Sequence, residues 1–124
     1  MALRLLEQLE EPIAATVLVA PPIREIGIVK FDELNSTFLD EPFDYGRIKA
    51  NAGEIVYLMA DNDPYVPQDQ LRELASLLGV VPNVIEDGGH LNADSGYTTF
   101  PALLTLLTGR LASTLSGRQI LQNL

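Results

Sequence analysis

The sequence predicts an α/β fold in which about three parallel strands are flanked by helices. Apolar runs rich in β-branched residues alternate along the chain with segments in which leucines recur at helical spacing. The strand-like runs are apolar throughout, which is typical of a parallel sheet covered on both faces. With 124 residues, of which 47% are hydrophobic, the chain can bury one modest core. We therefore expect one compact domain, or a piece of a larger one.

The first half of the chain is expected to hold a helix, a strand and a long loop. In residues 2–10 the leucines lie at helical spacing, and Pro12 ends the helix. Residues 14–20, AATVLVA, form the first strand. From about 23 to 53 the periodicity is lost, so we expect a long loop with one short helix at 45–50. A loop of this length in a compact domain is usually functional, as a lid or a rim.

The second half repeats the alternation of strand and helix. The expected elements are a strand at 54–60, a helix at 71–78 closed by Gly79, a strand at 82–86 and a helix at 100–111. Parallel strands joined in this way place function in the loops at their carboxyl ends. We expect a domain over residues 1–112 and assign no place to the tail, residues 113–124.

The charge of the chain disfavours several classes of partner. Eight Lys and Arg residues against seventeen Asp and Glu residues give a formal charge of −9, which repels nucleic-acid backbones and anionic lipid surfaces. There is no cysteine, so disulfides, thiolate metal sites and a cysteine nucleophile are excluded. The acidic, amphipathic start is unlike a secretory signal, and the longest apolar run is too short to cross a bilayer. We expect a cytoplasmic protein that binds no nucleic acid and no membrane.

The stretch MADNDPYVP, residues 59–67, ends an apolar strand on two aspartates and two prolines. An aspartyl-phosphate hydrolase carries two carboxylates in a D-x-D-x-T pattern at such a place, but it needs a later lysine, and none follows Lys49. A calcium loop of the EF-hand type would want a glycine at 66 and an acid at 72, where this chain has Val66 and Arg72. Both interpretations are disfavoured, and we expect no metal ion and no cofactor.

A third interpretation is the acid of a Ser-Asp-His triad, which in α/β-hydrolases follows the nucleophile and precedes the histidine. Here acids after one strand are followed by the chain's only histidine, His90, after the next strand. Each feature alone also has a structural explanation. An aspartate before a proline can form an Asx-turn or cap a helix, and a histidine beside two glycines can be a surface turn residue. The residues by themselves leave both explanations open.

Three segments resemble a known family. MADNDPYVP, DGGHLNADSGYTTFP and the approach segment FDYGRIKANAGEIVYL are similar to small serine hydrolases of the α/β-hydrolase superfamily, of the YdeN and retinoblastoma-binding-protein type. The resemblance covers nearly the whole chain and implies the carboxyl-terminal part of an α/β-hydrolase fold. It implies a triad acid at Asp63 and a triad base at His90. Asp61 would then be a turn residue or an acceptor behind the pair, and Gly88 and Gly89 would let the backbone carry the histidine over the sheet edge.

The nucleophile of this family lies in a G-x-S-x-G turn between a strand and a helix, and no serine of the chain lies in such a motif. The family order implies that residues 2–10 are the helix after that turn. We therefore expect the nucleophile and the oxyanion-hole donors to lie ahead of Met1. The strand at 14–20 would then lack its neighbour, so we expect a homo-oligomer or a partner chain at that strand edge.

Two classes of function stay open. One is a serine hydrolase acting on a small ester or a related acyl substrate, represented here by its acid and histidine half and inactive alone. The other is a non-catalytic binding or scaffold domain derived from the same fold.

Overall fold

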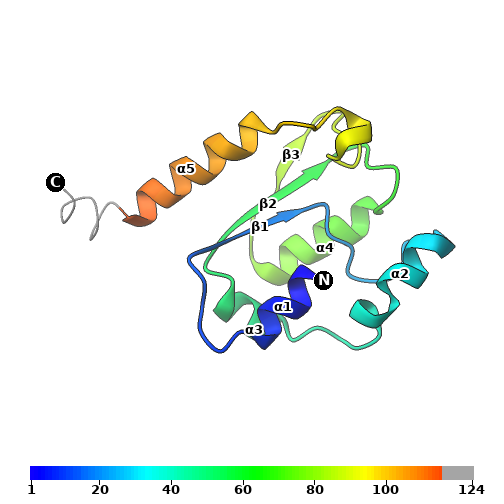
Figure 1. The fold of residues 1–124 in the computed structure, drawn as a ribbon, viewed down its shortest axis with the longest axis horizontal. Coiled ribbons are helices and arrows are strands. Elements are labelled where there is room, and N and C mark those ends of the chain that lie inside the picture. Colours follow the sequence, from blue (N-terminus) through cyan, green and yellow to red (C-terminus); the bar gives the residue numbers. More distant parts are fainter. Residues whose placement is uncertain (116–124) are drawn as a thin grey trace.

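Three parallel strands in the order β1-β2-β3 form the centre of the fold (Figure 1). The computed structural model describes residues 1–115. Along the chain the elements are α1 (Ala2–Gln8), β1 (Ala15–Val19), α2 (Val29–Leu39), α3 (Tyr45–Asn51), β2 (Glu54–Ala60), α4 (Gln68–Leu78), β3 (Asn83–Ile85), the 3₁₀ helix η1 (Ala93–Ser95) and α5 (Pro101–Leu115). The α/β class and the three parallel strands expected from the sequence are confirmed.

The central strand, β2, pairs in parallel with both neighbours. Val19 of β1 lies opposite Leu58, and Ile85 of β3 lies opposite Ala60. Because all three strands run the same way, the turn after β2 and the loop after β3 leave the same edge of the sheet. The N–H of Asp61 extends the pairing by donating to Ile85 O at 3.2 Å. The residues that follow these two strands therefore start side by side.

Both faces of the sheet are covered (Figure 1). On β2, Tyr57 and Met59 belong to a core shared with α1, α3 and α4, whereas Val56, Leu58 and Ala60 belong to a second core shared with α5. All five side chains are at most 1% exposed. Burial of a large apolar side chain contributes about 1.5–3 kcal/mol. Burial on both faces explains why β2 reads as one continuous apolar run.

Residues 29–39 form the helix α2, so the expectation of an irregular loop with a single short helix is wrong for this segment. None of the side chains of α2 is buried, and its apolar residues form a weaker stripe than the one that reveals α4 in the sequence. Its first turn is held by the carboxylate of Asp32, which accepts hydrogen bonds from the N–H groups of Ile26 at 2.8 Å and Gly27 at 2.9 Å. The short helix expected at 45–50 is present as α3.

The last described helix, α5, continues to Leu115. The first residues of the expected tail are thus helical, and residues 116–124 lie outside the described part of the chain. Among residues 1–115 no helix combines the length and the apolar character needed to cross a membrane.

Tyr57 lies in the core between β2 and α4, where its hydroxyl donates a hydrogen bond to Leu71 O at 2.8 Å. Burial raises the pKa of this phenol above its ordinary value of 10.0. As the pH rises above that value, the unfolded chain releases the proton and the folded protein keeps it. Stability should therefore fall by about 1.4 kcal/mol per pH unit for this one group.

We expect Tyr57→Phe to lose about 1 kcal/mol at neutral pH, because one hydrogen bond is removed, and to lose less stability than the parent in alkali. Urea unfolding at a series of pH values from neutral to alkaline measures both effects. Tyr97→Phe, which changes a partly buried ring on the other face of the sheet, is the matched control. A Tyr57→Phe variant as sensitive to alkali as the parent would contradict the expectation.

Within the described residues, β1 has a strand on one side only. Ala20 N donates to Leu58 O and Ala14 O accepts from Glu54 N, so the even-numbered residues of β1 bond to β2 and the odd-numbered ones face the open edge. An open edge can pair with another chain. We expect association through this edge, seen by light scattering at tens of micromolar, an order of magnitude at which weak dimers form.

The variant Val17→Pro removes one outward N–H and leaves the bonds to β2 in place, so it should shift the protein towards a single chain. A parent protein that is a clean monomer at this concentration would count against pairing through β1.

Candidate active site

Two side chains meet at the carboxyl edge of the sheet. Asp63 follows β2 and His90 follows β3, and Oδ2 of the aspartate lies 2.8 Å from Nδ1 of the imidazole. The aspartate side chain is 0% exposed and the histidine side chain is 29% exposed. The contact expected between these residues is therefore present, with the carboxylate inside and the ring open to solvent on one side.

The carboxylate of Asp63 is held by its own turn. Its Oδ1 accepts hydrogen bonds from the N–H groups of Tyr65 at 2.8 Å and Val66 at 3.0 Å. This is an Asx-turn, so the structural explanation left open for Asp63 holds for one of its two oxygens. The helix-cap alternative does not hold, because α4 begins after Pro67, which provides no side-chain cap. Oδ2 remains free for the imidazole.

The contact with Asp63 decides which ring nitrogen of His90 is protonated. A carboxylate accepts hydrogen bonds, so Nδ1 carries the proton in the neutral ring and Nε2 keeps a lone pair. Nε2 is therefore the atom that can accept a proton from a neighbouring group. Among the described residues no hydroxyl group hydrogen-bonds to this ring.

Gly88 and Gly89, which were expected to let the backbone carry the histidine over the sheet edge, lie in close contact with their neighbours. A Cβ on Gly88 would lie 2.7 Å from Leu91 Cδ2 and 3.0 Å from Ala60 Cβ. Gly89 has φ +61°, and a Cβ there would lie 2.4 Å from Ser95 Oγ. A side chain at either position would therefore force its neighbours to move, and at Gly89 it would also strain the backbone.

The two residues before Asp63 accept hydrogen bonds from the histidine loop, the segment 86–92 that contains His90. Asp61 Oδ1 accepts a hydrogen bond from Asp87 N at 2.8 Å, and Asn62 Oδ1 accepts one from Gly89 N at 2.7 Å. Asp61 is thus an acceptor in the turn, one of the two roles expected for it, and its carboxylate does not contact the imidazole. The role of Asn62 was missed by the sequence analysis. The available signal was its place between two aspartates in a turn, where a short amide side chain can accept from a neighbouring backbone.

A pocket of about 320 Å³ opens beside the imidazole. Its lining residues are Pro22, Ile26, Phe31, Asn35, Tyr65, Val66, His90, Asn92 and Asp94. The Tyr65 ring stands edge-on to the His90 ring at 5.1 Å, and the Phe31 ring stands edge-on to the Tyr65 ring at 5.6 Å. Phe31 and Asn35 come from α2, so the helix that the sequence did not reveal supplies one wall of this pocket.

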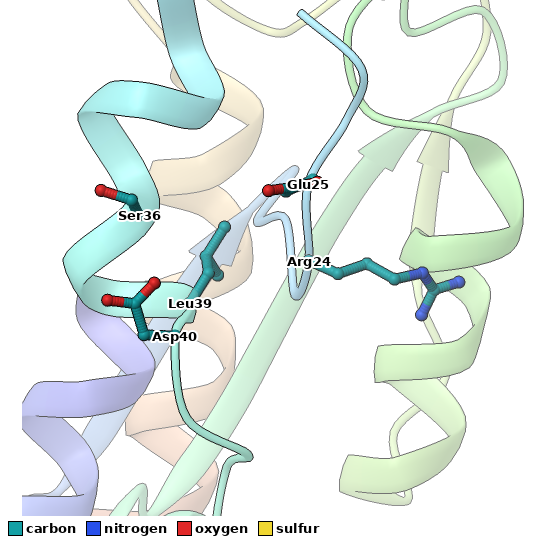
Figure 2. A pocket seen from close by; sticks show the side chains of 5 residues that line it. All are labelled: Arg24, Glu25, Ser36, Leu39 and Asp40. Atoms are coloured by element: carbon teal, nitrogen blue, oxygen red, sulfur yellow. The ribbon is translucent and has the colours of Figure 1, made fainter. Parts of the chain in front are cut away.

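A larger pocket, of about 520 Å³, is lined by residues of α2 and of the segment after β1 and contains no such pair (Figure 2). Ser36 on its wall donates its hydroxyl hydrogen bond to Glu33 O at 3.0 Å. Arg24 extends towards α4, where it pairs with Glu73 at 2.7 Å. Size alone would favour this pocket, but its lining holds no histidine, and among residues 1–115 no side chain accepts a hydrogen bond from the Ser36 hydroxyl. We therefore take the smaller pocket, which includes His90, as the candidate active site.

Ser95, the serine nearest to the histidine loop, has a different role from that of a nucleophile. Its Oγ accepts a hydrogen bond from the backbone N–H of His90 at 3.2 Å and donates one to Asn92 Oδ1 at 3.0 Å. It therefore supports the backbone of the loop. Within residues 1–115 no three His, Asp or Glu side chains are grouped closely enough to hold a metal ion.

Comparison with known proteins adds the family and the fold. A family model described as serine hydrolase matches residues 1–109. Among solved structures, the crystal structure of the ydeN gene product from B. subtilis matches with a TM-score of 0.76 at 24% sequence identity. The match covers 89% of this chain and 59% of that one, so the present chain spans less than two thirds of the length of that chain. At this identity the likeness shows a shared fold. No curated protein matches the chain.

The tautomer of His90 tests the contact with Asp63. In ¹⁵N NMR of the neutral ring we expect the proton on Nδ1, whereas free neutral histidine favours Nε2. Asp63→Asn should move the proton towards Nε2, because an amide group, unlike a carboxylate, can itself donate a hydrogen bond to Nδ1. The chain has one histidine, so the ring signals are unambiguous. Asp61→Asn makes the same chemical change two residues away and should leave the tautomer as in the parent. A parent ring protonated mainly on Nε2 would refute the assignment.

Proposed function

The chain belongs to the serine hydrolase family, and we propose that its residues supply the acid and the base of a hydrolase that acts on a small ester or a related acyl substrate. The observation that carries the proposal is the 2.8 Å contact between Asp63 Oδ2 and His90 Nδ1 at the carboxyl edge of a parallel sheet. In this proposal Asp63 orients the ring and His90 transfers protons.

The proposed mechanism follows from the geometry of the pair. Nε2 of His90 takes the proton of an attacking serine and later returns it to the leaving group. During this step the ring becomes positively charged, and the carboxylate of Asp63 beside Nδ1 stabilises it. Two backbone N–H groups already hold the carboxylate, so little reorganisation accompanies the change of charge.

The nucleophile is the part that these residues do not provide. No G-x-S-x-G occurs among the 124 residues, and neither Ser36 nor Ser95 bonds to the imidazole. In the proposal the serine and the oxyanion-hole donors come from a strand, turn and helix outside this stretch of sequence, either in the same polypeptide or in a second one. The present residues alone are then catalytically inactive.

The lining of the pocket beside His90 supports a small substrate with an apolar group. Five of its residues carry apolar or aromatic side chains, namely Pro22, Ile26, Phe31, Tyr65 and Val66. The volume of about 320 Å³ is at the lower end of the range for small-molecule sites. Asp94 is the one acidic side chain on the wall, and it disfavours negatively charged substrates.

A fluorophosphonate probe, which labels an activated serine, tests whether the nucleophile lies outside these 124 residues. We expect no labelling of the 124-residue chain, because removal of even one oxyanion donor slows such chemistry by about a hundred- to a thousandfold and here the nucleophile is absent as well. A longer polypeptide that carries G-x-S-x-G ahead of these residues should be labelled once per chain. His90→Ala in that polypeptide should abolish the labelling. Intact mass measures each outcome.

Two results would contradict the proposal. Labelling of the 124-residue chain that disappears in Ser95→Ala or Ser36→Ala would mean that the nucleophile lies within it. Failure of the longer polypeptide to label would favour the alternative of a non-catalytic binding or scaffold domain.

A further inference from the structure

The backbone around His90 adopts a left-handed conformation at alternate residues. The φ angles are +51° at Asp87, +61° at Gly89 and +54° at Leu91. Two of these three residues are not glycine, and an L-residue is strained in this region. Such strain persists only where the surroundings hold the backbone in place. The position of the imidazole therefore depends on whatever restrains this loop.

The turn after β2 supplies acceptors to the loop in sequence order. Asp61 Oδ1 accepts from Asp87 N at 2.8 Å, and Asn62 Oδ1 accepts from Gly89 N at 2.7 Å. The third residue of the turn makes the carboxylate–imidazole contact described above. Three consecutive side chains thus bind three successive groups of the loop, and only the last of them touches the ring.

We infer that Asn62 is a positioning residue that fixes the imidazole of His90 through the backbone of Gly89. Glycine has the greatest conformational freedom of all residues, and Gly89 directly precedes the histidine. Without the bond to Asn62, rotation about Gly89 would carry the ring away from the carboxylate. Ser95 restrains the next N–H, that of His90, at 3.2 Å, so the loop is held from two sides.

Asn62 suits this role because its amide is uncharged. It accepts from Gly89 without placing a further negative charge between Asp61 and Asp63. The side chain is exposed, so its truncation leaves the core intact. The inference rests on the proposed function for the task of His90.

The test compares four variants of the 124-residue chain by NMR. In Asn62→Ala we expect the Gly89 N–H to exchange its hydrogen with solvent about tenfold faster, which is the factor for the loss of one typical hydrogen bond. We also expect the neutral ring of His90 to shift from the Nδ1-protonated form towards the Nε2-protonated form that free histidine favours. Asn62→Asp keeps an acceptor oxygen, so it should return the exchange rate of the Gly89 N–H to the parent value and keep the neutral ring protonated on Nδ1, even with one more negative charge in the turn. Asn83→Ala is the control for a general loss of stability. It removes the hydrogen bond that the side chain of Asn83, in β3, donates to Tyr57 O, in β2, at 3.1 Å, and it should leave the ring signals of His90 unchanged. Asp63→Asn reports on the pair itself.

The outcomes separate the inference from the proposed function. Altered ring signals in Asp63→Asn with parent-like signals in Asn62→Ala would overturn the positioning role alone. Parent-like signals in Asp63→Asn would overturn the Asp63–His90 pair and with it the role of Asn62. If Asn62→Ala fails to fold, Asn62→Ser takes its place, because the shorter side chain of serine does not reach Gly89. Parent-like ring signals in that variant would likewise overturn the inference.

Discussion

The parallel pairing of β2 with β3 is the constraint on which the candidate site depends. It sets Ala60 beside Ile85, so that the turn that begins at Asp61 and the loop that begins after Ile85 start side by side. From there each residue of the turn reaches a group of the loop. A shift of one residue in this register would turn the side chains of β3 to the opposite face and would move every one of these contacts. The chemistry of the site is therefore linked directly to the packing of the sheet.

The second requirement is the burial of one carboxylate. Asp63 is fully shielded from solvent, and a buried carboxylate without partners is destabilising by several kcal/mol. Three donors offset this: two backbone N–H groups on one oxygen and the imidazole on the other. The imidazole is thus one of the groups that offset the free-energy cost of burying the carboxylate, and the aspartate in turn restrains the ring. Stability and the proposed proton transfer use the same contact.

The pocket is lined by segments that differ in how much of their side-chain surface is buried. His90, Tyr65 and Val66 belong to segments tied to the sheet, whereas Phe31 and Asn35 belong to α2, which buries no side chain. The wall formed by α2 is held mainly at its ends. Arg4 Nε donates to Phe38 O at 2.9 Å, and Asp32 restrains the first turn. The two walls of the pocket therefore differ in how much of their side-chain surface is buried in the fold.

The sequence by itself determined the strands, the helices that pack on them and the two loops that hold Asp63 and His90. Continuous apolar runs and helical leucine spacing are local patterns. The end of β2 at Ala60 was predicted to the residue because the buried part of the strand, Val56 to Ala60, has no charged residue and Asp61 follows it directly. Asp63 and His90 stood out through their order along the chain and through the family resemblance. Only the tertiary structure decided that α2 is a helix, since its apolar residues give a weak helical pattern.

The tertiary structure also decided the roles of Asn62, Ser95 and Tyr65. Asn62 reaches Gly89 across 27 residues, and this bond requires both the β2–β3 register and a left-handed backbone at the glycine. Contacts of this kind depend on several dihedral angles and on the pairing of distant segments at once. No local pattern in the sequence encodes them, because the partner of each side chain is chosen only when the sheet brings the two loops together.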